Sequence, residues 1–209
     1  MPRIPFPGGV IARALILVPL VMALWWFGFR PPSLSLLRTT AYLPLAFCVA
    51  PAGMDPIADG PVASQWTFNV ALEKAGKQLD TGRPLNIHTV SFEGEIDQLT
   101  LFAAGWPCYL ALALSAGGNW RRQIWKILRG EGLQTGINVV ALALWATSSA
   151  YLNTPLDSDN LGGLYHYVHY LCEITPLVSP FVVALIVHAE WRSCFDPAAR
   201  GALPGGSPS

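Results

Sequence analysis

The chain has 209 residues, of which 52% are hydrophobic and only 12% are Asp, Glu, Lys or Arg, about half the charged share of a typical soluble domain. The 13 basic and 13 acidic side chains cancel, which excludes a strongly basic nucleic-acid-binding protein and indicates no generally acidic partner. We therefore expect a chain solvated by lipid, with room for one membrane bundle and one small extramembrane module.

Long apolar segments are the strongest feature of the sequence, and each approaches the ~20 residues that a helix needs to cross ~30 Å of hydrocarbon. They predict four transmembrane helices, over Val10 to Phe29, Leu99 to Ala116, Leu133 to Leu152 and Val168 to His188. The expected fold class is an α-helical integral membrane protein with a small extracytoplasmic β-containing segment.

The first of these segments follows basic residues and resembles the start of a signal peptide. Its apolar run is about twice the usual minimum, and Trp25 and Trp26 stand where a cleavage site needs small residues. We therefore expect residues 1–32 to form an uncleaved anchor. The Trp pair should lie at the outer membrane interface, and Trp191 should mark the inner end of the fourth span.

Residues 33–97 are expected to form an extracytoplasmic segment. The apolar stretch Leu36 to Val49 has only about 14 residues, and burying Arg38 at the bilayer centre would cost ~2.5–3.5 kcal/mol. We therefore favour an interfacial or re-entrant helix over a fifth crossing. Alternating apolar residues then predict strands from Trp66 to Leu72 and from Leu85 to Ile96, in a small module of two or three strands.

Residues 98–191 are expected to form a three-helix transmembrane region with a basic cytoplasmic loop at 117–132. Within this loop, Asn119 to Gly130 has apolar residues at helical spacing and basic residues on the remaining surface, which predicts a short amphipathic helix against anionic headgroups. A docking surface for a cytoplasmic partner is the alternative. The residues assigned to the membrane interface here are Trp120, Arg121, Arg122, Trp125, Lys126 and Arg129.

The distribution of Lys and Arg predicts the orientation of the chain. Placing the N-terminus, the loop 117–132 and the C-terminus in the cytoplasm collects eight of the 13 basic residues there. The loop with Asp157 and Asp159 has no Lys or Arg and suits the outside. We also expect a disordered cytoplasmic tail at 192–209. The four cysteines form no CxxC motif, so no disulfide framework is predicted.

Ionisable residues gather at the start of the fourth span. At about 100° per residue, His166, His169 and Glu173 share one side of a helix, where two imidazoles and a carboxylate could bind a metal or relay a proton. A structural or interfacial role is the competing interpretation. The sequence has no GxSxG, Walker, HExxH or strand-linked GxGxxG motif, so we expect neither enzyme activity nor a cofactor.

The order of these segments and several local sequences resemble a known family. A second span that reads Leu101 to Pro107, the basic turn Asn119 to Gly130, a third span with Gln134 and an aromatic-rich last span from Tyr165 through Pro180 follow an anchor that ends in aromatic residues. This arrangement resembles the exosortase H-associated membrane proteins, small bacterial inner-membrane proteins encoded alongside exosortase H. The histidines and Glu173 of the fourth span are not part of that pattern.

The resemblance implies an accessory role in exosortase-type protein sorting or surface export, through contact with a membrane partner such as an exosortase. Exosortases are membrane-embedded cysteine transpeptidases, and neither Cys108 nor Cys172 matches the context of their catalytic Cys. The implied protein is therefore a helper in the inner membrane. Two alternatives stay open: a metal- or proton-handling membrane protein centred on the His/Glu face, and a structural subunit of another membrane complex.

Overall fold

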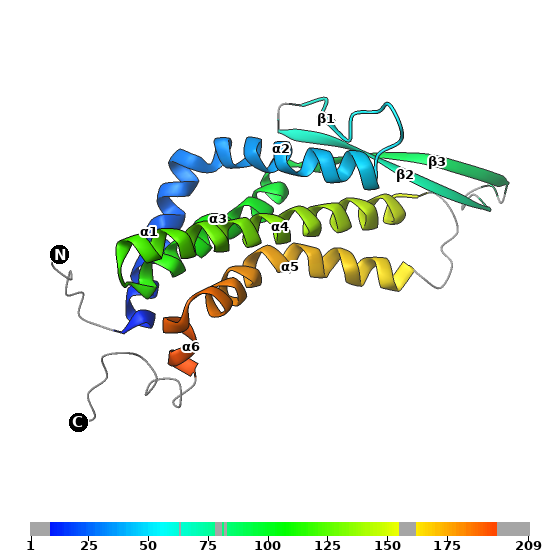
Figure 1. Ribbon diagram of the computed structural model, residues 1–209. Helices are drawn as coiled ribbons and strands as arrows, with labels where there is room; N and C mark the ends of the chain where they lie inside the picture. Colours follow the sequence, from blue (N-terminus) through cyan, green and yellow to red (C-terminus); the bar gives the residue numbers. More distant parts are fainter. Residues whose placement is uncertain (1–8, 63, 78–80, 82, 155–161, 196–209) are drawn as a thin grey trace, which may run out of the picture. The chain divides into compact units, whose positions relative to one another are not determined.

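The computed structural model describes residues 9–62, 64–77, 81, 83–154 and 162–195 (Figure 1). Its elements in chain order are α1 (Val10–Leu24), the π-helical turn η1 (Trp25–Phe29), α2 (Arg30–Cys48), β1 (Ile57–Asp59), β2 (Gln65–Lys77), β3 (Pro84–Glu95), α3 (Ile96–Ala116), α4 (Trp120–Leu152), α5 (Gly162–Val187) and α6 (Ala189–Phe195). Within the described chain, four helical stretches are long and apolar enough to cross a membrane. The predicted combination of four such helices with a small sheet is confirmed.

The sheet is antiparallel, in the order β1-β2-β3. Its alternating sequence buries one face, including Trp66, Phe68, Val70 and Leu72 of β2. The pairing of β2 with β3 begins at Gln65 opposite Glu95 and is irregular between Ala71 and Lys74. The β module predicted between the first two spans therefore has three strands.

The first apolar helix is longer than predicted. It does not end at Phe29, because one helical stretch of 39 residues runs from Val10 to Cys48 and joins the expected anchor to the expected interfacial helix. Pro31 and Pro32 follow the π-helical turn η1 at the start of α2, and neither ends the helical stretch. Whether the second half lies in the interface or crosses the bilayer stays a prediction.

The basic segment predicted as a separate loop helix is continuous with the third span. α4 runs unbroken over 33 residues, so the link from α3 consists only of residues 117–119. Gly130 looked like a helix end, but its structural role is packing: a Cβ added there would lie 1.8 Å from Oη of Tyr109 on α3. Its missing side chain lets two helices approach closely.

The other boundaries differ less from expectation. α3 begins at Ile96, three residues before the predicted start, and α5 ends at Val187. The tail predicted as disordered from 192 is helical as far as Phe195. The rest of that tail and the loop with Asp157 and Asp159 lie outside the described residues. Cys48, Cys108 and Cys172 are free thiols, and the Cys194 thiol donates to the carbonyl oxygen of Glu190 at 3.4 Å.

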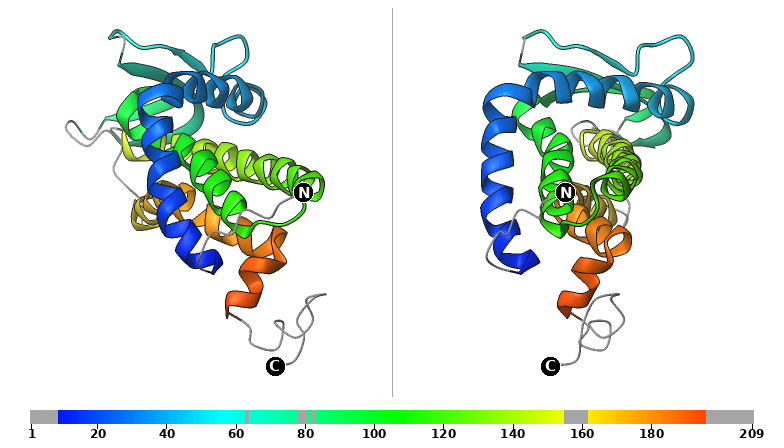
Figure 2. Two further views of the ribbon diagram at one scale, coloured as in Figure 1. Left: turned by 90° about the vertical axis from the view of Figure 1, so that its left-hand side faces the viewer. Right: turned by 60° about the vertical axis from the view of Figure 1, so that its left-hand side comes forward.

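The chain divides into two compact units. Unit 1 lies within 1–29, 104–136 and 178–209, and unit 2 consists of 30–103 and 137–177. In unit 2, α2 runs beside the sheet in both views of Figure 2. Arg38 of α2 makes this contact, because its Nη2 donates to the carbonyl oxygen of Ile57 at 2.7 Å and its Nη1 pairs with Asp59 at 2.5 Å.

Candidate functional site

α5 carries all three residues predicted to handle a metal or a proton, and the structure joins two of them. His169 Nε2 lies 3.3 Å from Glu173 Oε1, across one helical turn. His166 is exposed and is not grouped with this pair. Within the described part of the chain, no three His, Cys, Asp or Glu side chains lie together in a way that could hold a metal ion.

The other ring nitrogen of His169 contacts a serine that sequence analysis missed. Nδ1 lies 3.1 Å from Oγ of Ser149 on α4, which is 20 residues away in the sequence. In the tautomer whose proton is on Nε2, the nitrogen that faces Glu173, the ring accepts a hydrogen bond at Nδ1 from the serine hydroxyl. Ser149 then donates to His169, and the protonated Nε2 faces the Glu173 carboxylate at an ion-pair distance. We call these three residues the open triad.

An aromatic cluster forms the wall of the open triad. The ring of Trp145, one helical turn before Ser149, lies 5.7 Å from the ring of His169 at an interplanar angle of 31°. Its other neighbours are Phe68 of β2, Phe92 of β3 and Phe102 of α3, with ring centroids 5.6 to 5.8 Å away. The Trp145 side chain is buried, and its Nε1–H has no acceptor among the described residues.

The three residues of the open triad differ in exposure. Ser149 is only 4% exposed, whereas the side chains of His169 and Glu173 are 27% and 31% exposed. A molecule in the surroundings of α5 can therefore reach the imidazole and the carboxylate, with the serine hydroxyl directly behind them.

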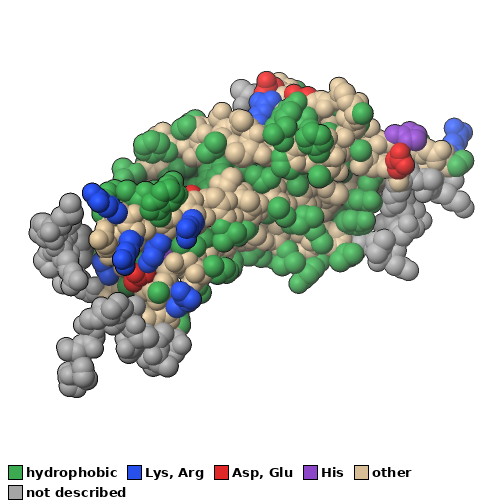
Figure 3. Space-filling model, in the orientation of Figure 1, with side chains coloured by type: hydrophobic (Ala, Val, Ile, Leu, Met, Phe, Trp, Pro, Cys, Tyr) green, Lys and Arg blue, Asp and Glu red, His purple; other side chains and the backbone are tan. Residues whose placement is uncertain are grey.

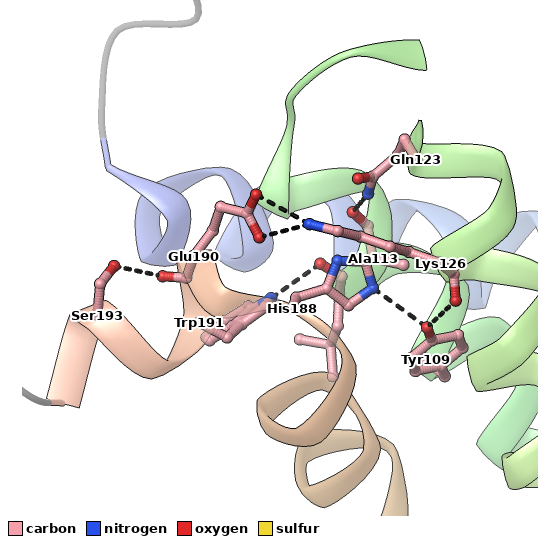
Figure 4. A network of polar contacts seen from close by, with 9 residues as sticks. Tyr109, Ala113, Gln123, Lys126, His188, Glu190, Trp191 and Ser193 are labelled. Atoms are coloured by element: carbon pink, nitrogen blue, oxygen red, sulfur yellow. Dashed lines mark hydrogen bonds and ion pairs between the residues drawn. The ribbon is translucent and has the colours of Figure 1, made fainter. Parts of the chain in front are cut away.

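A second polar cluster lies in unit 1, where α3, α4 and the junction of α5 with α6 meet (Figure 4). Tyr109 Oη lies 3.1 Å from the carbonyl oxygen of Lys126 and 3.1 Å from Nε2 of His188. A carbonyl only accepts, so the single tyrosine proton goes to Lys126 and the histidine Nε2 must donate to Tyr109. Tyr109 and His188 are fully buried, and Nδ1 of His188 has no partner in the described chain. We call this the closed cluster.

Charged and polar groups surround the closed cluster. Lys126 Nζ pairs with both carboxylate oxygens of Glu190 at 3.1 and 3.2 Å, and Trp191 Nε1 donates to the carbonyl oxygen of Leu112 at 2.9 Å. Burial lowers the pKa of His188, the nearby Lys126 ammonium lowers it further, and Glu190 opposes them. His188 is therefore held neutral.

The residues predicted at the membrane interface are divided between surface and interior. Figure 3 shows basic side chains gathered over the start of α4, where Trp120 and Trp125 are 62% and 66% exposed. Arg121, Arg122 and Arg129 are also exposed, and so is Trp26. By contrast, Trp25 and Trp191 are buried in the protein, and Lys126 is engaged by Glu190. Sequence position alone could not separate the two groups.

Comparisons with protein-family models, curated proteins and solved structures found no match to this chain.

Proposed function

We propose that the protein is a multi-pass protein of the bacterial inner membrane that assists exosortase-type protein sorting or surface export by contact with another membrane protein. The four helical stretches in the described part of the chain that have the length and apolarity of membrane spans support the membrane location. The exosortase H-associated resemblance supports the sorting system. The charge distribution supports cytoplasmic termini and contact of the basic start of α4 with anionic headgroups.

α2 has two apolar faces, one buried and one exposed, and the exposed face is the observation that carries the partner-binding part of the proposal. Leu37, Ala41 and Leu45 recur at helical spacing and are at most 2% exposed. A second set recurs on another side of the helix and is 53%, 61% and 86% exposed. These residues are Leu36, Leu43 and Phe47. We call them the α2 apolar face.

Arg38 fixes the direction in which this face points. Besides its bonds to Ile57 and Asp59, its guanidinium lies 5.9 Å from the centre of the Trp66 ring. α2 is thereby held against the sheet at three points. A partner would meet a preformed surface and would lose little entropy in ordering it.

The test is affinity purification of the tagged full-length protein from its native membrane in mild detergent, followed by mass spectrometry of what stays bound. Recovery of an exosortase, or of proteins with C-terminal sorting tails, supports the proposal. Leu43→Ala with Phe47→Ala should reduce recovery at least about fivefold, which corresponds to about 1 kcal/mol of binding. Leu15→Ala with Leu20→Ala on α1 is the matched control, since these residues are 73% and 53% exposed. Purification of the protein alone, at normal abundance, would refute the proposal.

The native cysteines test the proposed orientation. Cys48 is exposed at the end of α2, and Cys194 is partly exposed in α6. A membrane-impermeant maleimide added to spheroplasts should label Cys48 and should reach Cys194 only after permeabilisation. Cys48→Ser identifies the labelled site. The reverse pattern would place the termini outside.

Proton handling is a second candidate function, and the open triad is the observation that favours it. Ser149 and Glu173 contact the two ring nitrogens of His169, so the imidazole lies between a hydroxyl and a carboxylate. Glu173→Gln and His169→Gln test it in reconstituted vesicles with a pH-sensitive dye. Loss of proton flux with normal membrane abundance and normal partner capture would support this function, and unchanged flux would oppose it.

A further inference from the structure

The hydroxyl of Ser149 differs from the other Ser and Thr hydroxyls of α4. Thr135, Thr147 and Ser148 each donate to a backbone carbonyl three or four residues earlier, at 2.7 to 2.9 Å. This local bond is the usual way for a hydroxyl to be satisfied in an apolar helix. Ser149 instead contacts Nδ1 of His169. Its position beside an imidazole is therefore not explained by the needs of the helix.

From this arrangement we propose that Ser149 is a nucleophile for acyl transfer, with His169 as its general base and Glu173 as the carboxylate that orients the base. A serine hydroxyl is a weak nucleophile by itself and requires an adjacent base that a third group holds in place. The two contacts of 3.1 and 3.3 Å provide this order of groups. The inference goes beyond the proposed accessory role and does not depend on it.

Trp145 supplies an independent indication that a ligand belongs here. Its buried Nε1–H has no acceptor among the described residues, and leaving such a donor unsatisfied costs roughly 1–3 kcal/mol. The residue lies one turn before Ser149 and packs against His169. The oxyanion of a tetrahedral intermediate is the kind of acceptor that this donor lacks.

The surroundings indicate an apolar acyl group. Trp145 and its phenylalanine neighbours form the wall of the site, and exposed Tyr170 and Leu171 of α5 follow His169 in the chain. α5 itself has the apolarity of a membrane span. The substrate class is therefore a carboxylic ester whose acyl chain partitions into lipid.

The reaction balances without a further reagent. Ser149 Oγ attacks the ester carbonyl carbon as its proton passes to Nδ1 of His169, and Glu173 stabilises the imidazolium through Nε2. The tetrahedral intermediate collapses with cleavage of the bond to the alcohol oxygen, and the alcohol leaves with the Nδ1 proton. Water then attacks the acylated serine and gives a proton to Nδ1. Release of the carboxylic acid returns that proton to Oγ.

The test uses the full-length protein in detergent and in lipid nanodiscs, with an alkyl fluorophosphonate probe and with p-nitrophenyl esters of short and long acyl chains. Wild-type protein should be labelled on Ser149, as located by peptide mass spectrometry, and should hydrolyse the long-chain ester faster. Ser149→Ala and His169→Gln should each reduce labelling by at least about 100-fold, and Glu173→Gln by about tenfold.

The chain provides matched controls for the two central residues. Ser148 is a buried serine next to Ser149 whose hydroxyl bonds Trp145 O, and His166 is an exposed histidine one turn before His169. Ser148→Ala and His166→Gln should leave labelling within about twofold of wild type. Thermal unfolding of each variant separates loss of chemistry from loss of fold. A folded wild type that is unlabelled in both media, or equal labelling of Ser149→Ala, overturns the proposal. If the same samples capture the partner normally, the accessory role is still supported even though the nucleophile proposal has failed.

Discussion

His169 and His188 show how differently one side chain can be placed in the two units of this protein. His169 is partly exposed, and each of its ring nitrogens contacts a side chain that can gain or lose a proton. His188 is fully buried, and Tyr109, its partner at Nε2, commits its proton to the backbone oxygen of Lys126. The open triad is suited to moving protons, whereas the closed cluster is suited to joining helices.

The largest loss of stability is expected from a substitution at Gly130, which packs against Tyr109 of the closed cluster. Gly130→Ala would place a methyl group 1.8 Å from Oη and 2.0 Å from Cζ of the buried Tyr109, so the whole ring must move. We expect a loss of about 3 kcal/mol in unfolding free energy, measured by thermal unfolding in detergent.

Neighbouring glycines provide the control for that substitution. A Cβ added at Gly132 or Gly136 has no atom within 4 Å, so alanine at either position should be neutral or stabilising by up to about 1 kcal/mol. If Gly130→Ala is as stable as Gly132→Ala, the close approach of α3 and α4 at Tyr109 is wrong.

Acid should destabilise the closed cluster through His188. The fold lowers the pKa of His188 below its ordinary value of 6.5, so above pH 6.5 the residue is neutral in both the folded and the unfolded chain. As the pH falls below 6.5, the unfolded chain binds a proton more readily than the folded chain, and the free energy of unfolding decreases. The loss should approach 1.4 kcal/mol per pH unit until the lowered pKa is reached. His188→Leu should flatten this dependence in thermal unfolding between pH 7 and 5.

The smallest effects should come from the ion pairs of the two units. Lys126 and Glu190 have side chains that are 32% and 26% exposed, so Glu190→Gln should cost about 1 kcal/mol. Asp59, the partner of Arg38, is 86% exposed, so Asp59→Asn should cost only a few tenths of a kcal/mol. Unfolding free energies of the two variants, measured at low and high salt, check this ranking. A larger loss for Asp59→Asn than for Glu190→Gln would contradict the prediction that the less exposed ion pair contributes more to stability.

Periodicity and composition were sufficient to predict most of the fold. Four apolar stretches of suitable length and two alternating segments led to the observed helices and sheet. The boundaries failed where local signals competed with packing. Gly130 has the chemistry of a helix end, and only the nearness of Tyr109, a residue of another helix, explains why α4 continues through it.

The candidate sites were less accessible to sequence reasoning. His169 and Glu173 could be paired because four residues along a helix form a local relation. Ser149 could not be added to them, since one serine in an apolar span is ordinary and its contact depends on how two helices pack. His188 was recognised only as the end of a span, because its partner Tyr109 is 79 residues away.

α4 is longer than a membrane crossing requires. At about 1.5 Å per residue its 33 residues extend about 50 Å, about 20 Å more than the hydrocarbon it would cross. Among the candidate spans found in the described residues, α4 is the one without a proline, so it lacks the commonest cause of a helix kink. The excess length corresponds to the basic start of the helix, so α4 has enough residues both to cross the hydrocarbon and to carry Arg121 and Arg122 beyond it.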